Sequence, residues 1–350
     1  MSAAKFIAAS RAPSGTKRFS HYAALPKSTG KQIAPAEFTF PLPPWNTFMP
    51  VQSLFQSVIL EGKQPGPHLL ILGGIHGDEY EPMAAVRKLI TSIDKSKLTG
   101  KVTLVPVVNE PAYERTSRTG PDDLDLARTF PGSPDGTITE QIASQATQLI
   151  QSADYLIDLH TGGVISNLAP FSGYTLHSNP EILDMQRRMA LALNLPVVWG
   201  TSAHLNGRSL SAARDLGVPA IYAEWGGGSG CNPEAVSGYT TGCLSVLAEL
   251  QMLEVSIERK SPLYHIEDDS SESGHLQLHN NAPVAGFFEP AVQLMDRVQA
   301  GDALGTISSV LGDQNTTVSA NQTGVILGLR TLPYVEQNEW LAVILETERT

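Results

Sequence analysis

The sequence predicts an α/β fold, a sheet with helices on its faces, followed by a small all-β domain. Two observations carry this prediction. Short apolar runs alternate with amphipathic segments as far as about residue 260, which is typical of α/β proteins. A polar, acidic segment at 267–273 ends this pattern, and beyond it short β-like runs are separated by Gly, Asn and Asp. We therefore expect an arm at 1–36, a main domain at 37–260 and a β-barrel or sandwich-like domain at 275–350.

The main domain begins with an apolar run at 69–72 that ends at Gly73-Gly74, which predicts a buried strand before a tight turn. Helices and strands then alternate. The expected helices are 82–90, 140–151, 180–193, 210–216 and 242–257. The expected strands are 102–108, 155–159, 196–198 and 220–223.

A faint internal repeat lies in the C-terminal segment. The stretch Val298–Leu304 recurs as Val335–Leu341, and each copy has a turn pair between apolar residues. This pattern predicts two hairpin-bearing halves of a small β barrel or sandwich.

Composition limits the class of protein. With 350 residues, 41% hydrophobic and 17% charged, the chain is an ordinary globular protein and not a disordered one. No apolar run reaches the roughly 18 residues of a membrane span, so no membrane association is expected. The net charge of -11 disfavours nucleic-acid binding.

The cysteines and the N-terminal residues bear on the cellular compartment of the protein. Two cysteines without C-x-x-C spacing are too few for a disulfide framework, which predicts a reducing, cytoplasmic setting. Residues 1–36 contain several Lys and Arg and no acid, but lack the apolar core of a secretory signal. We interpret them as a basic arm that could strap onto a neighbouring subunit of a homo-oligomer.

A candidate metal site lies at the ends of two predicted strands. His76 and Glu79 are three residues apart on the loop that leaves the first strand, and His160 follows the strand at 155–159. Such strand ends converge on one crevice in open α/β sheets. His and carboxylate ligands suit zinc, whose catalytic sites use three protein ligands. The spacing therefore predicts one Zn²⁺ per chain.

Three further side chains could carry chemistry. Arg118 and Arg128, in a long loop that follows Asn109, could bind a carboxylate or polarise a carbonyl; the alternative is ion pairing with the aspartates at 122–125. Glu224 ends an apolar strand before a glycine-rich turn, where a general base could face an activated water.

In combination, four motifs resemble the succinylglutamate desuccinylase/aspartoacylase family of zinc carboxypeptidase-like hydrolases. They are H-G-D-E at 76–79, R-x-x-P-D-x-x-D-L-x-R-x-F-P-G at 118–132, D-L-H-T-G-G at 158–163 and A-E-W-G-G-G at 223–228. The resemblance runs from residue 38 to the C-terminus. It implies a mixed, mostly parallel sheet with helices on both faces, and small N-acyl amino acids as substrates.

The resemblance also implies a role for each matching residue. His76, Glu79 and His160 would be the zinc ligands. Glu224 would be the general base that later protonates the departing amine. Arg118 would polarise the scissile carbonyl, and Arg128 would hold the substrate carboxylate. Apart from the resemblance, we expect Asn109 to bind the substrate as well.

One position departs from the family pattern. Where the family has D-L-N-R, this sequence has Ala127 beside Arg128. The missing amide puts the usual carboxylate recognition in doubt and indicates a changed substrate. Asn109, Arg208 or Arg214 could compensate.

These features predict a zinc-dependent deacylase that hydrolyses the linear amide bond of a small N-acyl amino acid. Two alternatives stay open: a carboxypeptidase-like peptidase, and a protein that binds an amino-acid-like ligand without turning it over. The G-x-S-x-G, P-loop, H-E-x-x-H and G-x-G-x-x-G motifs are absent from the sequence, which disfavours serine hydrolases, NTPases, thermolysin-like proteases and dinucleotide enzymes.

Overall fold

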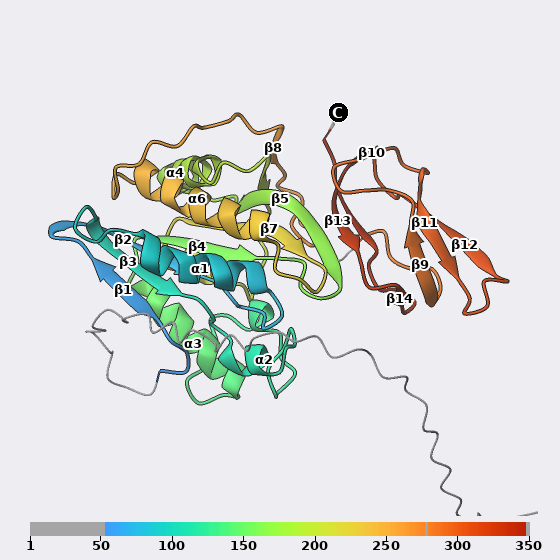
Figure 1. Ribbon diagram of the computed structural model, residues 1–350, viewed down its shortest axis with the longest axis horizontal. Coiled ribbons are helices and arrows are strands. Elements are labelled where there is room, and N and C mark those ends of the chain that lie inside the picture. Colours follow the sequence, from blue (N-terminus) through green and yellow to red (C-terminus); the bar gives the residue numbers. More distant parts are fainter. Residues whose placement is uncertain (1–52, 277–278, 348–350) are drawn as a thin grey trace, which may run out of the picture. The chain divides into compact units, whose positions relative to one another are not determined.

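The computed structural model describes residues 53–276 and 279–347, which lie in one compact unit. The predicted arm at 1–36 and the expected start of the main domain at 37 lie outside the described residues. As far as residue 267, strands and helices are interspersed (Figure 1). Their order is β1 (Val58–Glu61), β2 (Gln64–Leu72), α1 (Tyr80–Ser92), β3 (Thr99–Val105), α2 (Glu110–Glu114), the 3-10 helix η1 (Leu126–Arg128), α3 (Ile138–Gln151), β4 (Tyr155–His160), β5 (Ser166–Thr175), α4 (Pro180–Ala192), β6 (Val197–Thr201), α5 (Ser209–Leu216), β7 (Ala220–Gly227), α6 (Pro233–Glu249) and β8 (Tyr264–Glu267).

These strands form a mixed sheet, as predicted. Its order is β1-β3-β2-β4-β7-β5, and β6 joins β5 to β8. The pairs β2–β3, β2–β4, β4–β7, β5–β6 and β6–β8 are parallel, whereas β1–β3 and β5–β7 are antiparallel. Neighbouring parallel strands β2, β4 and β7 therefore end at one edge of the sheet.

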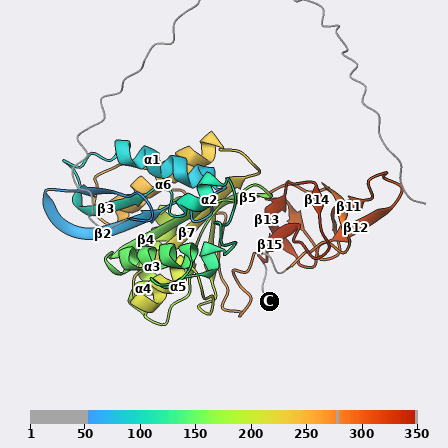
Figure 2. The same ribbon diagram turned by 90° about the horizontal axis from the view of Figure 1, so that it is seen from below.

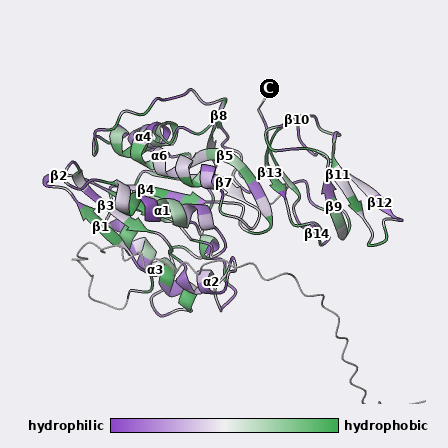
Figure 3. Ribbon diagram, viewed as in Figure 1, coloured by the Kyte–Doolittle hydropathy of each residue, from purple (hydrophilic) through white to green (hydrophobic). Residues whose placement is uncertain are grey.

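Both faces of the sheet are covered by helices, which also confirms the prediction. Alternate residues of β2 enter two different cores, Leu69 and Ile71 one of them and Leu70 and Leu72 the other. The first core includes residues of α1, α4 and α6, and the second includes residues of α3 and α5. Figure 2 shows α3 and α5 on one side of β4 and β7 and α1 on the other. The surface helix α1 carries hydrophilic and hydrophobic residues in turn (Figure 3), because only one side of it faces the core.

Several features of the main domain differ from the sequence-based expectation, among them strands β1 and β8 and helix α2, which were not expected. The helix expected at 242–257 is wrong in its bounds: α6 spans Pro233–Glu249, because Asn232 caps its first turn and Pro233 occupies a first-turn position. Strand β5 was not expected, since Pro170 and a glycine interrupt its pattern. The structure accommodates the proline where the register of β5 against β7 shifts between Leu168 and Phe171.

The C-terminal segment is all β in its described residues. Its strands are β9 (Gly286–Pro290), β10 (Arg297–Val298), β11 (Ala303–Ser308), β12 (Asn315–Ser319), β13 (Gly324–Arg330), β14 (Tyr334–Val335) and β15 (Ala342–Leu345). Four of them form a separate sheet in the order β12-β11-β9-β14. Strand β13 instead pairs with β5, so the large sheet continues into this segment through β13, β10 and β15. The boundary expected at 267–273 stays a prediction.

The two copies of the sequence repeat form the same turn. Asp302 accepts a hydrogen bond from the backbone N–H of Gln299 at 2.8 Å, and Glu339 accepts one from Glu336 at 2.8 Å. The residue before each acid, Gly301 or Asn338, has a positive φ. Within the part of the chain that the structure describes, no helix is long and apolar enough to cross a membrane.

Candidate active site

The predicted metal ligands lie at the edge where β2, β4 and β7 end. His76 and Glu79 belong to the loop between β2 and α1, and His160 is the last residue of β4. Glu224 of β7 is the direct register partner of His160. Since paired residues on adjacent parallel strands point to the same face, the sheet itself places Glu224 beside the three candidate ligands.

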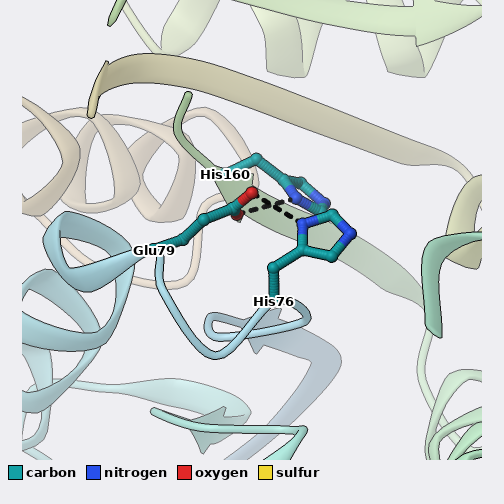
Figure 4. Close-up of side chains that lie close together, drawn as sticks. All are labelled: His76, Glu79 and His160. Carbon is teal, nitrogen blue, oxygen red and sulfur yellow. Dashed lines mark hydrogen bonds and ion pairs between the residues drawn. The ribbon is translucent and has the colours of Figure 1, made fainter. Parts of the chain in front are cut away.

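His76, Glu79 and His160 converge on one another (Figure 4). Glu79 Oε1 lies 2.6 Å from His76 Nδ1, and Glu79 Oε2 lies 3.1 Å from His160 Nδ1. The side chains of His76 and Glu79 are almost fully buried, and that of His160 is 11% exposed. Their ligand atoms lie within 4.8 Å of one another, so this group can hold a metal ion.

The opposite nitrogen of each imidazole is held by an aspartate. Asp125 Oδ1 lies 3.1 Å from His76 Nε2, and Asp158 Oδ2 lies 3.1 Å from His160 Nε2. The Ser209 hydroxyl also donates to Asp158. Carboxylates in this position fix the tautomer of a metal-binding histidine, so that with both imidazoles neutral the Nδ1 lone pairs would be available to a metal ion. The donor set and its surroundings therefore fit a zinc ion.

Charge stabilises this cluster despite its burial. Burial alone would raise the pKa of the Glu79 carboxyl, but His76 and His160 lower it well below its usual range. Burial alone would lower the pKa of His160, but Asp158 and Glu79 raise it well above its usual value. Each group thus depends on its neighbours for its charge state.

Glu224 has a different environment from Glu79. Burial raises its pKa to about 8, and His160 opposes the shift while the charge of Glu79 adds to it. Its Oε2 atom is buried without a hydrogen-bond partner among the described residues. A carboxyl with a pKa near neutrality can both accept and release a proton at working pH.

Arg118 is ion-paired and still lines the cavity. Its Nη2 and Nε atoms donate to Asp125 Oδ2 at 2.9 and 3.2 Å, and its Nη1 lies 3.8 Å from Glu79 Oε1. The ion-pairing alternative is therefore correct for Arg118 and Asp125. Because Asp125 contacts both His76 and Arg118, it ties the guanidinium to the metal-binding group.

A cavity of about 200 Å³ opens beside this group. Arg128 and Arg208 line it, and their guanidinium groups donate to the carbonyls of Ala127 and Gly274. Burial, together with the charge of Arg128, lowers the pKa of Arg208 to about 10. Among the described residues neither arginine has a carboxylate partner within ion-pair distance, so the pair is suited to an anionic ligand.

Asn109 and Arg214 are placed differently from Arg208. Asn109 is fully buried, and its side chain caps α2 by accepting from the N–H of Ala112. Arg214 donates to the Ala203 carbonyl and pairs with Asp215. Neither lines the cavity, whereas Ala127 does. Of the three residues expected to compensate for Ala127, only Arg208 reaches the cavity.

Two aspartates of this site escaped the sequence-based analysis as functional residues. Asp158 lies two residues before His160 on one strand, so period-two alternation puts both on the same face and could have identified it. Asp125 could be seen only as an ion-pair partner for an arginine. Its contact with His76 brings together residues 49 positions apart, for which the sequence carries no local signal.

The neighbouring acids hold the loops that carry the site. Asp78 Oδ2 accepts from the N–H of Val164 at 3.1 Å, after the glycines that follow His160. Glu81 Oε1 accepts from Gly227 and Asn232 at 3.1 and 3.2 Å, after the strand end that carries Glu224. The segment 76–81, a loop and the first turn of α1, therefore carries two candidate ligands and holds the two other strand ends.

Comparison with known proteins agrees with this geometry. Residues 65–250, more than half of the chain, match the model of the succinylglutamate desuccinylase/aspartoacylase catalytic domain. The chain is 29% identical over 292 residues to N-alpha-acetyl-L-2,4-diaminobutyric acid deacetylase from Halomonas elongata, covering 80% of this chain and 82% of that protein.

Solved structures show the same fold. A succinylglutamate desuccinylase/aspartoacylase from Rhodobacter sphaeroides is 25% identical with a TM-score of 0.76, covering 84% of this chain and 90% of that one. The product-bound ectoine utilization protein from Ruegeria pomeroyi has a TM-score of 0.75 at 24% identity, covering 83% and 88%. The chain therefore belongs to the succinylglutamate desuccinylase/aspartoacylase family.

Proposed function

We propose that the chain is a zinc-dependent deacylase that hydrolyses the amide bond of a small N-acyl amino acid. The observation that carries the proposal is the His76–Glu79–His160 group with the buried Glu224 carboxyl on the adjacent strand. The relative from Halomonas elongata is named as a deacetylase of an N-acetylated amino acid, and this name supports the proposed substrate class.

Zinc held by His76, Glu79 and His160 would polarise the scissile carbonyl and lower the pKa of a water molecule. Glu224 accepts a proton from the attacking water as its oxygen bonds to the carbonyl carbon. It then delivers that proton to the amide nitrogen as the C–N bond breaks. The products are a carboxylic acid and a free amine.

Arg118 would stabilise the negative charge that develops on the carbonyl oxygen. Asp125 accepts hydrogen bonds from its Nη2 and Nε atoms. The Nη1 atom, which lies toward Glu79, would therefore be the one that donates to the carbonyl oxygen. Asp125 therefore acts as a positioning residue for both His76 and Arg118.

Arg128 and Arg208 would bind the carboxylate of the amino acid. Two guanidinium groups without carboxylate partners line the cavity, and a substrate carboxylate would relieve their mutual repulsion. Arg208 would thereby replace the amide that Ala127 lacks. Cytoplasmic location and a homo-oligomeric state remain predictions.

The proposal is tested with zinc-loaded protein and a panel of N-acetyl amino acids, by measuring amine release. Wild type should release amine, and Glu224→Gln should keep its zinc while losing a factor of about 10² to 10⁴ in rate. Full turnover by zinc-loaded Glu224→Gln would contradict the mechanism. Cleavage of peptides only would favour the peptidase alternative, and binding without turnover would favour the ligand-binding alternative.

A further inference from the structure

The cavity beside the metal-binding group has two chemically different walls. Arg128 and Arg208, from η1 and the start of α5, form a cationic wall. Apolar side chains also line the cavity, among them Leu205, Leu210 and Leu276. Three others come from the residue before β5, from β5 and from the C-terminal segment: Ile165, Leu168 and Trp340. We call these three residues the apolar wall.

Backbone pairing brings the members of the apolar wall together. Leu168 is the register partner of Gly328 on β13. The N–H of Thr331 donates to the Ile165 carbonyl at 2.9 Å, and the N–H of Arg330 donates to the carbonyl of Leu341, next to Trp340, at 2.8 Å. The indole thus lies beside the end of β13 where it meets β5.

Trp340 is held firmly in place. The preceding residue, Glu339, pairs with the buried Arg330 at 2.9 Å, and its backbone carbonyl accepts from Ala282 at 2.8 Å. Trp340 itself bridges to Asn281 and packs on a core that includes Phe171. A fixed aromatic surface in a cavity is a means of selecting apolar ligand groups.

The charged side chains that line the cavity belong to other parts of the site than the apolar wall. The acids that line the cavity, among the described residues, are Asp78, Glu79, Asp158 and Glu224. All four belong to the metal-binding group or to its supports, and the lining arginines belong to the cationic wall or pair with Asp125. A charged group on the apolar wall would therefore be left without a partner, which is costly.

We infer that the apolar wall binds the acyl group of the substrate, so the preferred substrates carry an apolar acyl chain of several carbons. This inference rests on the proposed function. The carboxylate of an N-acyl amino acid lies on the amine side of the scissile bond. With that carboxylate on the cationic wall and the carbonyl at the metal-binding group, the acyl chain is left to face the apolar wall.

The test compares N-acetyl, N-butanoyl, N-hexanoyl and N-succinyl derivatives of the amino acid whose acetyl derivative is hydrolysed fastest. We expect kcat/KM to rise about fourfold for each added methylene, and the succinyl derivative to be poorer than the butanoyl one. A flat series, or a preference for acetyl or succinyl, would overturn the inference while leaving deacylase activity intact.

Variants of Trp340 test whether the indole causes the dependence of kcat/KM on acyl-chain length. Trp340→Ala should reduce the gain to less than about twofold per methylene, and Trp340→Phe should keep part of it. The matched control is Phe287→Ala, because Phe287 is an exposed aromatic residue of the C-terminal segment that does not line the cavity. A Trp340→Ala series as steep as that of wild type would contradict the role of the indole. If Trp340→Ala does not fold, the wild-type series decides.

Binding separates this inference from the proposed function. If no derivative is hydrolysed, the proposed function fails, and calorimetric titration of the N-acyl-L-alanine series still tests the wall. Affinity that rises with chain length supports the apolar wall. Affinity that stays constant, or no binding of any derivative, overturns it.

Discussion

Replacing Asp158 with Asn should weaken zinc binding without removing a ligand. Asp158 is almost fully buried, and its Oδ2 lies 3.1 Å from His160 Nε2. The carboxylate accepts the Nε2 proton and so leaves His160 Nδ1 free as a lone-pair donor. An amide in its place can donate to Nε2 and stabilise the other tautomer, whose Nδ1 carries a proton and cannot bind a metal.

Loss of such a partner typically costs a factor of 10 to 100 in metal affinity, or about 1.4–2.7 kcal/mol. We expect the upper part of this range, because Asp158 is almost fully buried and its Oδ2 also accepts from the Ser209 hydroxyl. The dissociation constant for zinc, measured by competition with a chromogenic chelator, checks this value. The control is Asp154→Asn, an acid just before the same strand that accepts the backbone N–H of His68. Zinc affinity of Asp158→Asn within twofold of wild type would refute the argument.

Three other predictions concern stability. Burial lowers the pKa of His68 below 6.5, so the neutral imidazole contributes its full stabilisation above pH 6.5 and loses it as pH falls toward the lowered pKa. The free energy of unfolding in urea should therefore fall between pH 7 and pH 5.5 in wild type, and fall less in His68→Gln. Phe171→Ala should cost about 3–5 kcal/mol in urea unfolding because Phe171 is fully buried, whereas the exposed Phe287→Ala should stay within about 0.5 kcal/mol; equal values would contradict the core assignment. Gly163→Ala should destabilise by about 1–3 kcal/mol, since φ is +59° and the new Cβ would lie 2.7 Å from Asp78 Oδ2; an unchanged midpoint would contradict that contact.

Sequence patterns predicted most of the main sheet because its strands contain apolar runs, several of which lead into glycine-containing turns. The run 69–72, for example, is buried on both faces and therefore carries an uninterrupted signal. Strand β5 gave no such signal, since Pro170 sits at a register shift that only the tertiary structure makes tolerable. The start of α6 was missed because the cap at Asn232 follows a glycine-rich turn that resembles an extended loop.

The residues of the candidate site also fall into those that the sequence could predict and those that it could not. His76, Glu79, His160 and Glu224 could be predicted because each stands at a strand end, where chain order reveals convergence. The roles of supporting residues depend on long-range contacts that leave no local pattern. Asn109 illustrates the limit, because an amide near the arginine-containing loop was expected to bind substrate, and in the structure its side chain caps α2 and does not line the cavity.

The central claim is that His76, Glu79 and His160 hold one metal ion for hydrolysis. It is tested most directly by the zinc content per chain, measured by plasma mass spectrometry on untagged protein purified without chelator. The account predicts about one zinc ion per wild-type chain and little in a folded His76→Ala variant. Wild-type protein that contains no zinc and takes up none when it is added would contradict it.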